Sequence, residues 1–203
     1  DPTRNSQEPT RATPHDTTER EALLNIAHMV GDMHQPLHVG AAYIDSDDTF
    51  IVPSNADEEK ATFTKGGNLI CHGAKNLHSY WDTDLVVKAM KSAHALTNED
   101  FEKQLLPLAK KTKVDQTAVT GWPKKWATET LRVSKQELAT LTVIDQREPG
   151  KNSDCSHSRE TKEGVVWDVD FPDGYASDGA KTAKEQLAKA GARLAYLLNA
   201  VLK

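Results

Sequence analysis

Two histidine–aspartate pairs with the same spacing constrain this chain more than any other feature. The first pair is His28 and Asp32, and the second is His78 and Asp82. Side chains four residues apart on an α-helix lie on one face, one turn from each other. Each pair can therefore present an imidazole and a carboxylate in the same direction. The sequence predicts two helices whose polar faces meet at one place.

A third histidine follows the first pair in a constrained position. The chain reads Gln35-Pro36-Leu37-His38, and a proline disfavours helix at the residue before it and fixes the chain direction. His38 can therefore return toward the first pair from a rigid turn. Imidazole nitrogens and carboxylate oxygens without a thiolate suit zinc or manganese. The expected metal ligands are His28, Asp32, His38, His78 and Asp82.

A plainer interpretation exists for each pair alone. A single histidine–aspartate pair on a helix can be a surface salt bridge worth a few tenths of a kcal/mol, about 0.2–0.5. Two such pairs together with a proline-anchored third histidine favour the metal site. The remaining histidines have no partner at ligand spacing. For His34 we expect solvent exposure or a supporting hydrogen bond, and we expect surface positions for His72, His94 and His157.

Apolar residues recur at helical spacing along most of the chain, which predicts an all-α fold. The 203 residues suit one large domain. Thr18 and Glu21 form a capping-box sequence at the start of the first helix. Gly191, inside the last helix, costs roughly 1 kcal/mol relative to alanine and so indicates close helix packing. The expected helices cover about 18–33, 76–89, 97–109, 122–138 and 178–202.

Other segments lack that spacing. Residues 1–17 are predicted to be an extended lead-in, and residues 18–203 to be the helical domain. Residues 40–65 are an acidic insertion loop that could hold a pair of strands, and residues 145–176 look irregular. Gly66, Gly67 and Asn68 predict a turn between the two histidine–aspartate pairs, because glycine tolerates tight backbone conformations.

Charge and cysteine content exclude several classes of protein. The net charge of −5 argues against a broad basic surface for duplex DNA. No window approaches the roughly 18 consecutive apolar residues that a membrane helix needs. Cys71 and Cys155 permit one disulfide, but the sequence does not establish that they pair.

The residue identities within the motifs are more informative than their spacing alone. The first motif, HMVGDMHQPLHVG, resembles the H-x-x-G-D-x-x-Q-P-L-H signature of the zinc-dependent single-strand nucleases of the S1/P1 type. These belong to a superfamily that also contains zinc phospholipase C. Further along this chain, GGN followed by NLHSYWDT resembles the family's next motif. The final segment, AKEQLAKAGARLAYLLNAVL, resembles the family's C-terminal helix. The resemblance covers most of residues 20–203.

The resemblance implies a mostly helical bundle with three zinc ions in a cleft. His28 would bind the first zinc of a close pair, and Asp32 would bridge that pair and serve as the catalytic residue. The other zinc would be held by His38, His78 and Asp82. Asn68 would lie near the nucleotide pocket.

The resemblance also implies a reaction. Water held by the metals would attack phosphorus in line, and single-stranded RNA or DNA would be cut to 5′-nucleotides, with 3′-nucleotidase activity. The metals would neutralise the phosphate and stabilise the leaving group. Such nucleases are exported, which implies a secreted or periplasmic location. One alternative is a zinc phospholipase C, although that branch uses Glu at the position of Asp82. The other is a catalytically incomplete, zinc-stabilised fragment.

One departure from the family affects the expected number of metals. Family members take further zinc ligands from an N-terminal segment, whereas this chain starts Asp1-Pro2 and reaches the first motif by His28. We therefore expect one complete zinc site and half of the close pair. A second chain could supply the other ligands, the sequence could be part of a longer enzyme, or the protein could have kept one zinc and lost the reaction.

Overall fold

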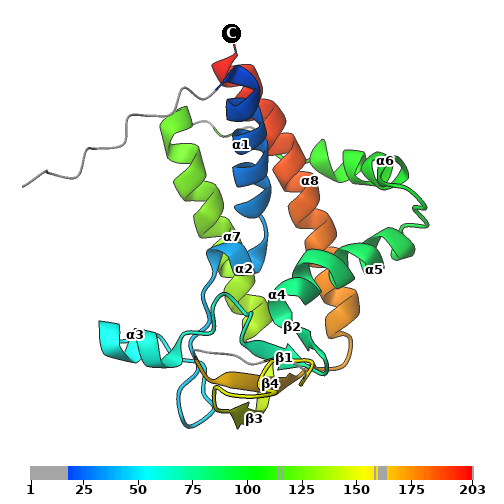
Figure 1. Cartoon of the computed structure of the whole chain (residues 1–203). Coiled ribbons are helices and arrows are strands. Elements are labelled where there is room, and N and C mark those ends of the chain that lie inside the picture. The colour runs from blue at the N-terminus through cyan, green and yellow to red at the C-terminus, as the bar shows by residue number, and fades with distance from the viewer. Residues whose placement is uncertain (1–17, 114, 116, 158, 160–163, 203) are drawn as a thin grey trace, which may run out of the picture.

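Three long helices lie alongside one another in the computed structural model, which describes residues 18–113, 115, 117–157, 159 and 164–202. They are α1 (Glu19–Asp32), α7 (Trp122–Leu138) and α8 (Tyr175–Val201). Figure 1 shows them in the upper part of the molecule, with a small sheet at the lower end. The prediction of a mostly helical domain is confirmed. The expected lead-in, residues 1–17, lies outside the described residues.

The first helix begins as the capping box predicts. The Glu21 backbone N–H donates to the Thr18 hydroxyl at 3.2 Å, and the Thr18 N–H donates to the Glu21 carboxylate at 2.9 Å. After α1 the chain turns into the short helix α2 (Pro36–Val39), with Pro36 in its first turn and Gln35 as its N-cap. A proline is tolerated there because the first N–H groups of a helix have no intrahelical partner.

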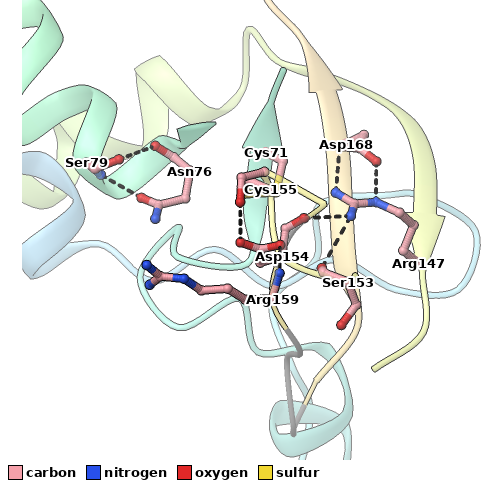
Figure 2. Close-up of a disulfide and its surroundings, with 10 residues drawn as sticks. Cys71, Asn76, Ser79, Arg147, Ser153, Asp154, Cys155, Arg159 and Asp168 are labelled. Carbon is pink, nitrogen blue, oxygen red and sulfur yellow. Dashed lines mark hydrogen bonds and ion pairs between the residues drawn. A yellow bond between two sulfur atoms is a disulfide. The ribbon is translucent and has the colours of Figure 1, made fainter. Parts of the chain in front are cut away.

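The second predicted helix is present but is not uniform. Asn76 caps it by accepting a hydrogen bond from the Ser79 N–H at 2.7 Å, a contact visible in Figure 2. It comprises α4 (Leu77–Ser79), a π-helical turn η1 (Tyr80–Asp84) and α5 (Leu85–Ser92). The π turn was not predicted. Such wide turns are rare and occur frequently at functional sites.

The remaining predicted helices are confirmed. Helix α6 (Asn98–Ala109) is capped by Thr97 and contains Pro107, and the short 3-10 turn η2 (Val119–Gly121) precedes α7. Helix α8 contacts α1, α5 and α6, so it is the central element of the bundle. Among the described helices, none combines the length and the apolar character needed to cross a membrane.

A four-stranded sheet is the main feature that the sequence analysis missed. Its order is β2-β1-β4-β3, made of β1 (Ile70–His72), β2 (Lys75–Asn76), β3 (Thr142–Arg147) and β4 (Val166–Asp170). Strand β1 is antiparallel to β2 and parallel to β4, and β3 is antiparallel to β4. The prediction that residues 145–176 are irregular was wrong for both strands there. Val166, Trp167 and Val169 of β4 are buried in the core.

Covalent and ionic contacts fasten the sheet. Cys71 of β1 forms a disulfide with Cys155, which the sequence had left open. Arg147 of β3 donates two hydrogen bonds to Asp168 of β4, at 2.7 and 3.0 Å, and also binds the Ser153 and Asp154 carbonyls. Figure 2 shows this group together, so residues 153–155 are held against β1 and β3.

The insertion at 40–65 contains more structure than a loop. Isolated β-bridges join Tyr43 to Phe63 and Ile44 to Phe50, which resembles the strand pair considered possible. An unpredicted helix, α3 (Ala56–Thr62), lies between them, with Asn55 as its cap. Ile44 is fully buried in the core beside the sheet, so the insertion is anchored to the domain.

Gly40 and Gly179 pack tightly against other elements, but Gly191 does not. A Cβ added at Gly191 would meet nothing within 4 Å, so the expected close packing there was wrong. A Cβ at Gly40 would lie 1.9 Å from the Ser134 hydroxyl oxygen of α7, and one at Gly179 would lie 2.9 Å from a Leu85 methyl carbon. The chain following α2 therefore needs glycine to approach α7.

These glycines give a matched pair of substitutions. Gly40→Ala is expected to lower the free energy of unfolding by about 1–3 kcal/mol, because the methyl group overpacks against Ser134. Gly191→Ala is expected to raise it by up to about 1 kcal/mol, because alanine favours helix and the space is open. Urea denaturation of both variants measures the difference, and equal effects would contradict this account of the packing.

Candidate metal centre

The structure brings the five expected ligands together. The last turns of α1 carry His28 and Asp32, the short helix α2 carries His38, and α4 with its π turn carries His78 and Asp82. Each of these side chains lies within 3.4 Å of another member of the set. The Pro36 turn between α1 and α2 therefore places His38 between the two pairs, as the sequence indicated.

His38 is the central side chain of this cluster. Its Nδ1 lies 3.3 Å from an Asp32 oxygen, and its Nε2 lies 3.4 Å from an Asp82 oxygen. Its ring stacks on that of His78, with centroids 4.8 Å apart and planes 17° from parallel. One imidazole thus links carboxylates from two different helices.

Three of the five side chains are arranged to share one ion. Ligand atoms of His38, His78 and Asp82 all lie within 4.8 Å of one another. The side chains of both histidines are about one quarter exposed, and that of Asp82 is 39% exposed. Two imidazoles and one carboxylate with access to solvent match the three protein ligands and open position of catalytic zinc sites. These residues therefore fit a zinc ion.

The other pair is more open. His28 Nε2 lies 3.1 Å from Asp32, and the His28 side chain is 74% exposed. Neither residue belongs to the three-residue group of close ligand atoms. The pair offers two ligand atoms to a second ion, which is fewer than the four that zinc prefers.

Backbone and amide groups fix the ligands from behind. The Nδ1–H of His78 donates to the Gly66 carbonyl at 2.9 Å, which leaves Nε2 facing Asp82. Gln35 Nε2 donates to Asp82 at 2.8 Å, while its carbonyl oxygen accepts from the Leu37 N–H. Such partners orient metal ligands and raise their basicity. The sequence analysis did not assign these roles, although Gln35 and Gly66 both lie in the motifs it singled out.

The glycine turn is built for the Gly66 contact. Gly66 and Gly67 have φ of +62° and +87°, a conformation that residues with a Cβ rarely adopt. Asn68 of the same turn is exposed, and its side chain donates to the Lys65 carbonyl at 2.9 Å. Asn68 lines a cavity of about 340 Å³ with Asn76 and Asp84, separate from the ligand cluster. A nucleotide-binding role for Asn68 stays a prediction.

His34 is buried, so the expectation of solvent exposure was wrong. The alternative expectation, a supporting hydrogen bond, is confirmed. Its Nδ1–H donates to the Val30 carbonyl at 2.7 Å, and its Nε2 accepts from Arg193 at 3.0 Å. Burial, and secondarily the charge of Arg193, lower the pKa of His34. Gln186 of α8 donates to the His34 carbonyl at 2.9 Å. His34 therefore ties the turn after α1 to the central helix.

The three other histidines lie at the surface, as expected, whereas Trp81 belongs to the core. His72, His94 and His157 are exposed. Trp81, in the π turn, is buried, and its indole N–H donates to the Tyr175 hydroxyl at 3.0 Å. Open space lies beside the ligands, including a cavity of about 180 Å³ lined in part by Asp32, His38 and Asp82.

Comparison with known proteins shows the family to which this chain belongs. The family model described as S1/P1 Nuclease matches residues 4–203, almost the whole chain. The chain belongs to the S1/P1 nuclease family. This S1/P1 chain is 28% identical over 188 residues to Endonuclease 2 of Arabidopsis thaliana, covering 89% of the chain and 51% of the relative. It is 26% identical over 196 residues to Endonuclease 4 of the same plant, covering 89% and 50%.

A shorter match has higher identity. The S1/P1 chain is 32% identical over 93 residues to Endonuclease 1 of Arabidopsis thaliana, covering 42% of the chain and 24% of the relative. The chain spans about half the length of Endonucleases 2 and 4. No solved structure matches it at a significant level.

The cluster predicts how many zinc ions this S1/P1 chain holds by itself. We expect one tightly bound ion per chain, at His38, His78 and Asp82, measured by equilibrium dialysis and elemental analysis. His78→Ala should weaken zinc binding by about 100-fold or more, since even residues that only support ligands cost 10–100-fold. His94→Ala, an exposed histidine outside the cluster, is the control. Three tightly bound ions, or equal effects of both variants, would contradict this assignment.

Proposed function

We propose that this chain is a zinc-dependent phosphodiesterase that cleaves single-stranded RNA and DNA to 5′-nucleotides, with 3′-nucleotidase activity. The observation that carries the proposal is the group formed by His38, His78 and Asp82 in a member of a nuclease family. Zinc at such a site supplies positive charge for a phosphate and activates water near neutral pH.

The side chains of this chain have distinct roles in the proposal. His38, His78 and Asp82 hold the ion, while the contacts from Gln35 and Gly66 keep Asp82 and His78 in orientation. We assign Asp32 to the reaction because it lies between His28 and His38 and keeps 40% of its side chain exposed. An exposed carboxylate at the edge of the cluster could bind a metal through one oxygen and accept a hydrogen bond from the attacking water through the other.

Single strands are the substrate that suits the charge distribution. The chain carries a net charge of −5, so it has few cations to follow both backbones of a duplex. A metal cluster needs only one phosphate at a time. The exposed Asn68 turn, next to the His78 contact, is the proposed place for a base.

We further propose that the protein works outside the cytoplasm, secreted or in the periplasm. The Cys71–Cys155 disulfide supports this, because disulfides persist mainly in oxidising compartments.

The two-ligand pair of His28 and Asp32 leaves coordination positions for ligands from beyond the described residues, which a second chain could provide.

Substrate choice tests the proposed activity directly. The zinc-loaded chain is expected to cleave single-stranded polynucleotide, to leave a choline phospholipid intact, and to lose activity when zinc is chelated. Product analysis should find 5′-phosphates. Turnover of the lipid alone would support a phospholipase C instead. Zinc binding without hydrolysis of either substrate would support a zinc-stabilised, inactive fragment.

Asp32→Asn separates catalysis from structural zinc binding. It should lower the rate of polynucleotide cleavage by at least about 100-fold, at or beyond the upper end of the range for residues that only support ligands. The melting temperature should change little, because Asp32 is partly exposed. Asp173→Asn, an exposed aspartate outside the cluster, is the matched control. A lower melting temperature with an unchanged rate would contradict the catalytic assignment.

A further inference from the structure

A cavity of about 700 Å³ lies between α6, α7 and α8, in a part of the bundle to which the reaction assigns no role. None of the five expected ligands lines it, and neither does Asn68. Its size falls within the range of small-molecule sites, about 300–1,000 Å³. The cavity is thus large enough to hold a ligand of its own.

The cavity is cationic although the chain is acidic. Five lysine and arginine side chains line it against three carboxylates, whereas the whole chain has a net charge of −5. Two of the carboxylates already have partners: Asp115 pairs with Lys125 at 2.9 Å, and Glu129 pairs with Arg193. The excess positive charge in a partly enclosed space favours an anion.

Aromatic rings form part of the same wall. Trp122 and Trp126 are packed side by side with centroids 5.6 Å apart, and the Arg193 guanidinium lies 5.3 Å from the centroid of the Trp126 ring. Tyr196 is half-buried, and its hydroxyl donates to the Thr112 carbonyl at 2.9 Å. Cations interleaved with aromatic rings are the combination that binds a phosphate next to a base.

We infer that this cavity is a second nucleotide-binding site, separate from the metal centre. Lys111, just after α6, and Lys189 on α8 would contact the phosphate. Tyr196 would contact the base, beside the buried Trp122 and Trp126. The choice of a nucleotide among aromatic anions rests on the proposed function, because nucleotides are the products of that reaction.

The cavity adjoins the metal centre through one layer of side chains. Arg193 lines the cavity and donates to His34. His34 in turn lines the small cavity that contains Asp32, His38 and Asp82. A nucleotide in the second site would therefore lie behind the ligands and would not compete for the metal.

The test uses the full chain with 5′-AMP, a probe that has no 3′-phosphate to remove. Calorimetry and tryptophan fluorescence should show saturable binding both with zinc and after chelation. Adenosine and inorganic phosphate should each bind at least about tenfold more weakly than 5′-AMP. Failure of zinc binding or of hydrolysis would leave this result unaffected, so the two proposals can fail independently.

Charge-reversal variants locate the site. Lys189→Glu is expected to weaken 5′-AMP binding by about tenfold or more. Lys111→Glu should have the same effect, and it replaces the first variant if that variant fails to fold. Lys184→Glu makes the same charge change on α8 outside the cavity and should have little effect. Absence of saturable binding, equal binding of phosphate alone, or equal effects of Lys189→Glu and Lys184→Glu would overturn the inference.

Discussion

The contact of one imidazole with two carboxylates is the interaction around which the metal centre is organised. His38 lies 3.3 Å from Asp32 and 3.4 Å from Asp82, and those aspartates come from helices that are far apart in the sequence. Carboxylates gathered in one place repel each other unless a cation or a proton lies among them. The fold holds them together through the Pro36 turn and the caps of α2 and α4. A cluster built in this way is suited to a cation.

The sheet contributes to the centre although it carries none of the ligands. Strand β1 begins directly after the glycine turn whose Gly66 carbonyl orients His78. The Leu69 carbonyl accepts from the Trp167 N–H at 2.9 Å, and Cys71 is bonded to Cys155. The glycine turn is therefore fixed to β4 and to the segment before it. His78, which donates to the Gly66 carbonyl of this turn, is thereby held in a fixed orientation.

Patterns within a few residues correctly predicted the local features of the structure, because those features depend on contacts between neighbours in the sequence. The capping box at Thr18, the proline turn at Pro36 and the spacing of the histidine–aspartate pairs all act within a few residues, and the structure has them as expected. The sheet was missed because a short buried strand such as β4 lacks the alternation that marks an exposed one. The role of Gln35 could not be predicted, since its partner Asp82 is 47 residues away. The packing of Gly40 against α7 is likewise a long-range contact.

The π turn at Tyr80–Asp84 allows Leu85 to enter the core while Asp82 faces the metal cluster, which a regular α-helix would not allow. Its closing hydrogen bond runs from the Leu85 N–H to the Tyr80 carbonyl, so it holds one residue more than an α-helical turn. Leu85 is fully buried in the core, while Asp82 faces the cluster. Deleting one residue here would rotate one of these side chains by about 100° relative to the other. Insertions and deletions during divergence should therefore be selected against in these five residues.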